Sequence, residues 1–144
     1  MGLKWPKTGI NHAPAYQVSA IPYITRSAAL EVPAAVPGDV TATLKITFPF
    51  VTRFIAVKNA GSNPLRFGVS ALGVAGPASG QNTSTNYMEL ASGVASNRLE
   101  VKTKELYFAG TGGTTTFEVL AGLTTIEADQ LLTLTASNGL EGVG

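Results

Sequence analysis

The stretch Val40–Phe48, with the sequence VTATLKITF, alternates strictly between apolar and polar side chains. Its apolar positions are Val40, Ala42, Leu44, Ile46 and Phe48, and its polar positions are Thr41, Thr43, Lys45 and Thr47. A period of two residues places the two sets on opposite faces of an extended chain. The stretch therefore predicts a half-buried β-strand, which Pro49 ends or bulges.

Similar segments follow along the chain, rich in β-branched and aromatic residues and separated by Gly, Pro and Asn turn signals. The expected strands are 51–59, 65–70, 86–90, 98–110, 116–126 and 131–136. Within 98–110 the apolar phase slips around Thr103–Lys104, and a bulge or short turn is the physical device for such a slip. No segment favours a helix, and 71–85 is expected to be a long loop.

This pattern predicts an all-β fold, a single antiparallel β-sandwich that is jelly-roll-like and carries an extended N-terminal arm. We expect the sandwich domain to span residues 27–144 and the arm to span residues 1–26. The inward apolar positions predict a core made of Val40, Leu44, Ile46, Phe48, Phe54, Ile55, Val57, Phe67, Val69, Leu99, Val101, Leu106, Phe108, Phe117, Val119, Ile126, Leu132 and Leu134.

The arm combines prolines, apolar anchors and positive charge, with no acidic residue before Glu31. Its segments AYQVS and PYITR can each add to a sheet as an edge strand, where proline is tolerated and pairing with another chain is favoured. We therefore expect the arm to contact a neighbouring chain, although a solvated tail fits the same charges. The expected contact residues are Trp5, Pro6, Ile10, Pro14, Tyr16, Val18, Ile21 and Tyr23.

The composition favours a protein that is partly covered by partners. Of the 144 residues, 44% are hydrophobic and only 13% are charged, and charged residues are depleted at the centres of interfaces. A β-protein that is solubilised by Thr, Ser and Asn is the alternative explanation. The net charge of +1 gives no argument for nucleic acid, and no apolar stretch is long enough to predict a membrane span. The N-terminal run lacks the apolar centre of a secretory signal, which predicts use without export by that route.

The residues that chemistry requires are scarce, and we expect no enzyme and no cofactor. The chain has no cysteine and one histidine, His12, so a zinc site lacks ligands and a Ser–His–Asp site is not favoured. The nine acidic residues have no spacing that forces two carboxylates together. Glu127 and Asp129 share one turn, so a calcium site is one hypothesis for them and a solubilising turn is the simpler alternative.

The segments GINHAPAYQVSAIPYITRS, FPFVTRFIAVKNAGSNPLRFGVS, NYMEL, ELYFAG and FEVLAGLTTI resemble small β-sandwich virion proteins of marine tailed phages and large algal viruses. The resemblance implies a capsid accessory protein, which decorates, cements or forms vertices of a shell. It also implies that the protein assembles in the host cell and resides in the virion. The implied partners are copies of itself, as a trimer or pentamer, and the major capsid protein or other virion proteins, without catalytic residues.

A carbohydrate- or receptor-binding module of a virion fibre or spike is the alternative function. The expected loop 71–85 and the tyrosines Tyr16, Tyr23 and Tyr87 would form its binding surface, because tyrosine rings can stack on sugars. Tyrosine is also common in protein interfaces and half-buried strands, so these residues alone do not decide between the two functions.

Overall fold

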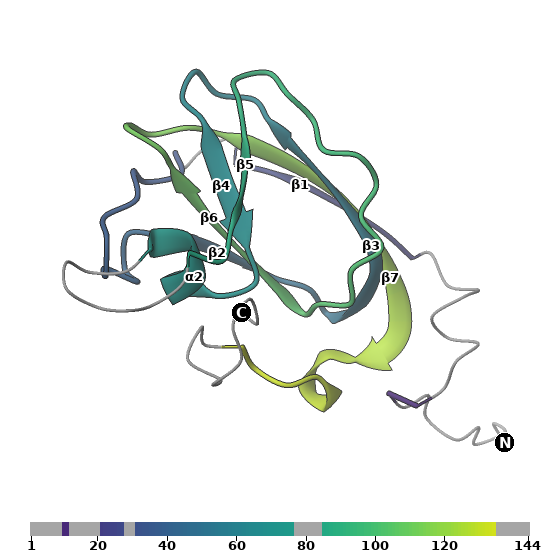
Figure 1. The fold of residues 1–144 in the computed structure, drawn as a ribbon. Helices are drawn as coiled ribbons and strands as arrows, with labels where there is room; N and C mark the ends of the chain where they lie inside the picture. The colour runs from purple at the N-terminus through teal and green to yellow at the C-terminus, as the bar shows by residue number, and fades with distance from the viewer. Residues whose placement is uncertain (1–9, 12–20, 28–30, 77–84, 135–144) are drawn as a thin grey trace, which may run out of the picture.

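A computed structural model describes residues 10–11, 21–27, 31–76 and 85–134 (Figure 1). Two antiparallel sheets face each other, which confirms the all-β sandwich; the jelly-roll connectivity stays a prediction. The three-stranded sheet has the order β1 (Ile21–Arg26), β7 (Phe117–Glu127), β3 (Phe50–Asn59). The four-stranded sheet has the order β2 (Leu44–Thr47), β6 (Glu105–Gly110), β4 (Leu65–Gly68), β5 (Met88–Leu90).

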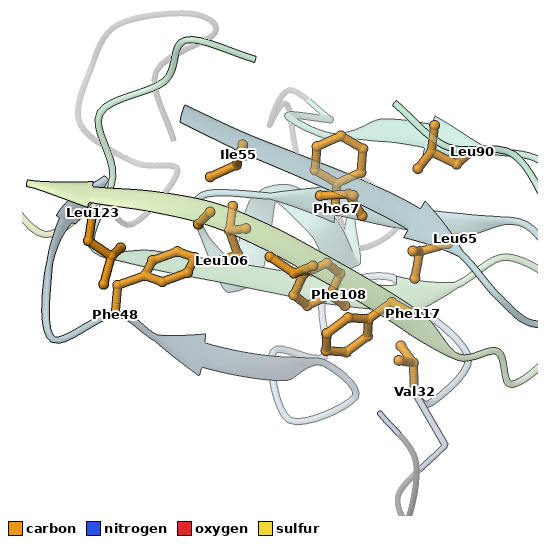
Figure 2. Close-up of a cluster of buried hydrophobic side chains, with 13 residues drawn as sticks. Val32, Phe48, Ile55, Leu65, Phe67, Leu90, Leu106, Phe108, Phe117 and Leu123 are labelled. Carbon is orange, nitrogen blue, oxygen red and sulfur yellow. The ribbon is translucent and has the colours of Figure 1, made fainter. Parts of the chain in front are cut away.

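The core fills the space between the two sheets (Figure 2). Phe108 of β6 and Phe117 of β7 stack with ring centroids 4.0 Å apart, so the two sheets meet through a pair of parallel rings. Tyr23 of β1 meets Phe48, which follows β2, edge to face at 5.0 Å. Aromatic pairs of this kind add about 0.5–1.5 kcal/mol to the burial of their area. The inner faces of the strands are therefore tied together both at the centre and at the β1–β2 side.

The strand predictions for the middle of the chain are confirmed, because β3, β4, β5 and β7 lie within or close to the expected ranges. The start of the strand predicted at Val40 is wrong, since β2 begins only at Leu44. Asp39 accepts a hydrogen bond from the Thr41 N–H at 2.9 Å, and the Thr43 hydroxyl donates to the Val40 carbonyl at 2.7 Å. These local bonds hold the segment as a turn, and Val40 is 47% exposed instead of belonging to the core.

Two further segments depart from the predicted strands. Residues 98–104 run as irregular backbone with a single bridge between Leu99 and Ile55, and β6 begins at Glu105. The predicted phase slip is found here: the Thr103 hydroxyl donates to the Glu105 carbonyl, and the Thr103 N–H donates to the Thr52 hydroxyl. Side-chain bonds of this kind satisfy backbone groups that a ladder would otherwise pair.

The predicted last strand is wrong over residues 131–134, and residues 135–136 lie outside the described residues. A short 3-10 helix (Ala128–Gln130) turns the chain after β7, and the Lys104 ammonium donates to the Leu131 carbonyl at 2.8 Å. Leu132 is therefore 72% exposed and not a core residue. Part of the predicted loop is also helical, because Ser70 caps the short helix α2 (Ala71–Ala75) through the Gly73 N–H.

The end of the predicted arm is a strand of the protein's own sheet. β1 pairs antiparallel with β7, from Ile21 opposite Leu123 to Arg26 opposite Glu118. The predicted boundary after residue 26 leaves this strand out of the sandwich, whereas the structure places it at the edge of the three-stranded sheet. The edge position tolerates Pro22, which has no N–H to give to a ladder. Residues 1–9 and 12–20 of the predicted arm lie outside the described residues.

Candidate functional site

The outer face of the three-stranded sheet carries a row of apolar side chains, which lies outside the core between the two sheets. Ile24 of β1 lies opposite Leu120 of β7, which in turn lies opposite Ala56 of β3. Their neighbours along each strand point inward, so alternation directs these three side chains away from the core. Ile24 is 78% exposed and Leu120 is 44% exposed, and Ile24 is the most exposed large hydrophobic side chain in the described part of the chain.

A charged row lies beside the apolar row, two residues after it in β1 and β3 and two residues before it in the antiparallel β7. Glu118 of β7 lies between Arg26 of β1 and Lys58 of β3. Its carboxylate is 3.6 Å from the Arg26 guanidinium and 3.7 Å from the Lys58 ammonium. Both distances exceed the usual length of a charge-assisted hydrogen bond. Two exposed cations therefore share one carboxylate through loose ion pairs.

The two rows form the floor of a groove of about 700 Å³, which we call the outer groove. Its wall is the segment that contains Ala95 and Ser96. Ser96 is held against β3 because its N–H donates to the Val57 carbonyl at 2.7 Å and its hydroxyl accepts from the Val57 N–H at 2.9 Å. The wall is thus fixed to the sheet by paired hydrogen bonds on one residue of β3.

The next row of the same face is closed by an aromatic ring. Phe54 of β3 lies opposite Gly122 of β7, and its ring occupies the space where a side chain at that glycine would stand. The Arg98 guanidinium lies 4.1 Å from the centre of the Phe54 ring, a cation–π contact. A β-bulge between Thr52 and Phe54 sets this placement. The outer groove therefore ends at a covered ring on this side.

The residues predicted to make contacts are only partly brought together. Ile21 is partly exposed on β1, and Tyr23 points inward onto Phe48. The Ile10 N–H donates to the Gln130 side-chain oxygen at 3.0 Å, so this residue contacts its own chain. The remaining predicted residues lie outside the described residues: Trp5, Pro6, Pro14, Tyr16 and Val18.

Sequence reasoning missed the residues of the outer groove. The available signal was a large apolar residue at an outward position of a strand. Ile24 follows the inward Tyr23 in this way, and Leu120 follows the inward Val119. Such a residue is ordinary when it stands alone on a surface. Only the register of β1, β7 and β3 shows that Ile24, Leu120 and Ala56 form one row.

A second polar cluster lies on the four-stranded sheet. Glu105 accepts hydrogen bonds from the Lys45 ammonium at 3.1 Å and from the Tyr107 hydroxyl at 3.0 Å. Burial by itself raises the pKa of Glu105, but these bonds and the charges of Lys45 and Lys104 outweigh it, and the net pKa lies below the ordinary 4.5. Burial and the Glu105 carboxylate raise the pKa of Tyr107 to about 12. The cluster keeps Glu105 ionised and Tyr107 neutral. This arrangement is typical of a structural ion pair, here between Lys45 and Glu105.

The described residues contain neither a cluster of metal-binding side chains nor a helix that could span a membrane. Within those ranges, no group of three or more His, Cys, Asp or Glu side chains could hold a metal ion, so Glu127 and Asp129 do not belong to such a group. No helix in the same part of the chain is long and apolar enough to cross a membrane.

The described tyrosines of the sugar-binding alternative are engaged within the chain. The Arg66 guanidinium lies 4.5 Å from the centre of the Tyr87 ring, and Tyr23 contacts Phe48. The Arg66 side chain therefore covers part of the Tyr87 ring, and Tyr23 packs onto the core. Comparisons of the chain with protein families, with curated proteins and with solved structures found no match in any of the three.

Proposed function

We propose that the protein is a viral structural protein, a capsid accessory subunit that decorates, cements or forms vertices of a shell. It associates with copies of itself, as a trimer or pentamer, and binds the major capsid protein or another virion protein. It resides in the virion after assembly in the host cell, and it performs no catalysis. The resemblance of its segments to small virion β-sandwiches motivates this assignment.

The single observation that supports it best is the outer groove. Full burial of an Ile or Leu side chain is worth about 1.5–3 kcal/mol. Ile24 and Leu120 lie in regular strands but remain exposed in the single chain, so they contribute much less than this to stability. A contiguous apolar surface with polar neighbours is typical of a site that another protein covers. A subunit of a shell needs such a site, whereas a freely diffusing monomer does not.

The position of β1 supports the proposed mode of assembly. β1 is an edge strand of the sheet, and in the sequence it is the last part of the predicted arm. The positive charge of the arm contrasts with the remainder of the chain, which holds seven basic and nine acidic residues. A basic segment that starts at an exposed edge is well placed to reach an acidic surface on a neighbouring subunit.

Sedimentation velocity of the full chain over a wide range of protein concentration tests the proposal. We expect a trimer or pentamer, and we expect a variant that lacks residues 1–20 to sediment as a monomer with an unchanged unfolding transition. That variant keeps β1, so the sheet remains complete. A full chain that stays monomeric at the highest concentration contradicts self-association, and equal masses for both chains contradict the role of the arm.

A further inference from the structure

We infer that the outer groove receives a segment of a partner protein that presents apolar side chains beside a carboxylate, and not the outer groove or the N-terminal arm of a second copy of this chain. The inference rests on the proposed function, because it assigns one surface of the assembly subunit to a partner other than itself. It concerns the residues of the apolar row, Ile24, Leu120 and Ala56, and of the charged row, Arg26, Glu118 and Lys58.

The charged row is one carboxylate short of neutrality. Arg26 and Lys58 flank Glu118, and their side chains are 66% and 50% exposed. The row therefore carries a surplus positive charge at the border of an apolar surface. A partner carboxylate placed beside the apolar row would pair with that charge, and opposite charges across an interface select the partner and its orientation.

A second copy of the same face does not meet this requirement. If a two-fold axis runs parallel to the strands, Glu118 faces Glu118 of the partner copy and Arg26 faces its Lys58, so like charges oppose one another. If the axis runs across the strands, each charged row lies over the row of Pro22, Gly122 and Phe54 of the other copy, which has no carboxylate. Like charges placed opposite each other oppose association. Both arrangements leave the surplus charge without a partner.

The N-terminal arm of a neighbouring copy does not supply the required carboxylate either. Its charged residues are Lys4, Lys7 and Arg26, and the first acidic residue of the chain is Glu31. An arm from a neighbouring copy would bring more positive charge to Arg26 and Lys58. The electrostatic match therefore points away from the arm and toward a segment with an acidic side chain.

The dimensions suit a short extended segment. Three neighbouring strands span roughly 10 Å, because adjacent strands are about 4.8 Å apart. An extended chain advances roughly 3.3 Å per residue, so about three residues lie across the apolar row. Ala95 and Ser96 line the groove at the β3 side, and among the described residues none beyond β1 lines it on the other side. The partner segment enters over β1 and places its carboxylate along the charged row.

Amide chemical shifts of the isotope-labelled full chain, followed during titration with two synthetic peptides, test the inference. The first peptide is acetyl-Val-Glu-Val-Glu-Val-amide, and the second replaces both glutamates with glutamine. We expect the glutamate peptide to shift the amides of Ile24, Ala56 and Leu120 and to bind about two- to fivefold more tightly than the glutamine peptide. Equal affinity for the two peptides, or no shift of these amides, overturns the inference.

Two variants distinguish the positive charge of the outer groove from the net charge of the protein. Lys58→Gln is expected to abolish the preference for the glutamate peptide, whereas Lys45→Gln is expected to keep it. Lys45 is a matched control, because its side chain is 46% exposed, it also pairs with a glutamate, and it lies on the other sheet. If both variants lose the preference equally, the peptide responds only to net charge and the assignment to the groove is overturned.

A third variant tests the excluded occupant. Ile24→Asp places a negative charge in the apolar row and is expected to weaken binding of both peptides while the sedimenting mass of the protein stays unchanged. A fall in that mass shows that a second copy occupies the groove and overturns the inference. A full chain that is monomeric and still prefers the glutamate peptide contradicts self-association in the proposed function but supports the groove assignment.

Discussion

Ser27 and Phe117 are joined by two hydrogen bonds that anchor the N-terminal strand to the core. The Ser27 N–H donates to the Phe117 carbonyl at 3.0 Å, and the Phe117 N–H donates to the Ser27 hydroxyl at 2.8 Å. Ser27 follows β1 directly, and the Phe117 ring stacks on Phe108 in the centre of the sandwich. The pair thus fixes the register of β1, which in turn places Ile24 and Arg26 in their rows.

The variant Ser27→Ala is expected to lower the free energy of unfolding by about 1–3 kcal/mol, because it leaves the buried Phe117 N–H without its acceptor. Urea unfolding measures the change. The control is Ser92→Ala, whose hydroxyl donates to the Gly61 carbonyl at an exposed site and should cost less than about 0.5 kcal/mol. Equal effects of the two variants would show that the Ser27–Phe117 pair does not stabilise the fold.

Asn59 is the centre of a polar network at one end of the sandwich. Its replacement is expected to lower the free energy of unfolding more than Ser27→Ala does. Its fully buried amide donates to the carbonyls of Asn63 and Leu90, and its oxygen accepts from the Gly61 N–H and the Thr115 hydroxyl. Asn59→Ala removes these four hydrogen bonds; the Thr115 hydroxyl can still donate to the Asn63 carbonyl at 2.9 Å, whereas the Leu90 carbonyl and the Gly61 N–H lose the Asn59 side chain as a partner. We expect a loss of about 3 kcal/mol or more in the free energy of unfolding, since each buried unsatisfied group costs about 1–3 kcal/mol.

Urea unfolding again measures the Asn59→Ala effect, with Asn97→Ala as its control. Asn97 is exposed, and its part in the described hydrogen bonds is that of a backbone acceptor from the Ser96 hydroxyl. The control is expected to change stability by less than about 0.5 kcal/mol. An Asn59→Ala protein as stable as the control would contradict the assigned role of the buried amide.

Gly122 and Phe54 are expected to be energetically coupled. A methyl group at Gly122 would overlap the Phe54 ring, so Gly122→Ala should destabilise the protein by about 1–3 kcal/mol. Once Phe54→Ala has removed the ring, the same glycine substitution should cost much less. A double-mutant cycle measured by urea unfolding gives the coupling. Additive effects of the two substitutions would contradict the packing of this ring over the glycine.

The Glu105 cluster predicts a specific dependence of stability on pH. Since the pKa of Glu105 in the folded protein lies below 4.5, its ionised form stabilises the fold above the unfolded pKa. That contribution is lost as the pH falls through the folded value. When the pH is lowered from neutral to below the folded pKa, we expect the free energy of unfolding to fall less for Glu105→Gln than for the wild type. Unfolding at a series of pH values measures this difference. Parallel curves for the two proteins would contradict this.

The strands were predictable where the alternation of side chains was local and uninterrupted. The residues Phe48, Val57, Phe67, Phe108 and Val119 lie inward as predicted, because the period of two residues is a property of the extended backbone itself. The prediction failed at Val40, where Asp39 organises a turn by bonds to its own neighbours. It failed at Leu132, because the short 3-10 helix after β7 moves the chain out of the sheet.

The candidate site was hardly predictable, because its rows combine residues that are far apart in the chain. Ile24 and Leu120 are neighbours only through the pairing of β1 with β7, and the pairing of β7 with β3 adds Ala56. The sequence by itself determined the all-β class, the inward faces of most strands and the capacity of the PYITR segment to act as an edge strand. The tertiary structure alone decided that this strand pairs with its own β7, that Ile24 remains exposed, and that two cations share Glu118. The physical reason is that register between distant strands depends on how their inner faces pack together, as Tyr23 does on Phe48 and Phe108 on Phe117.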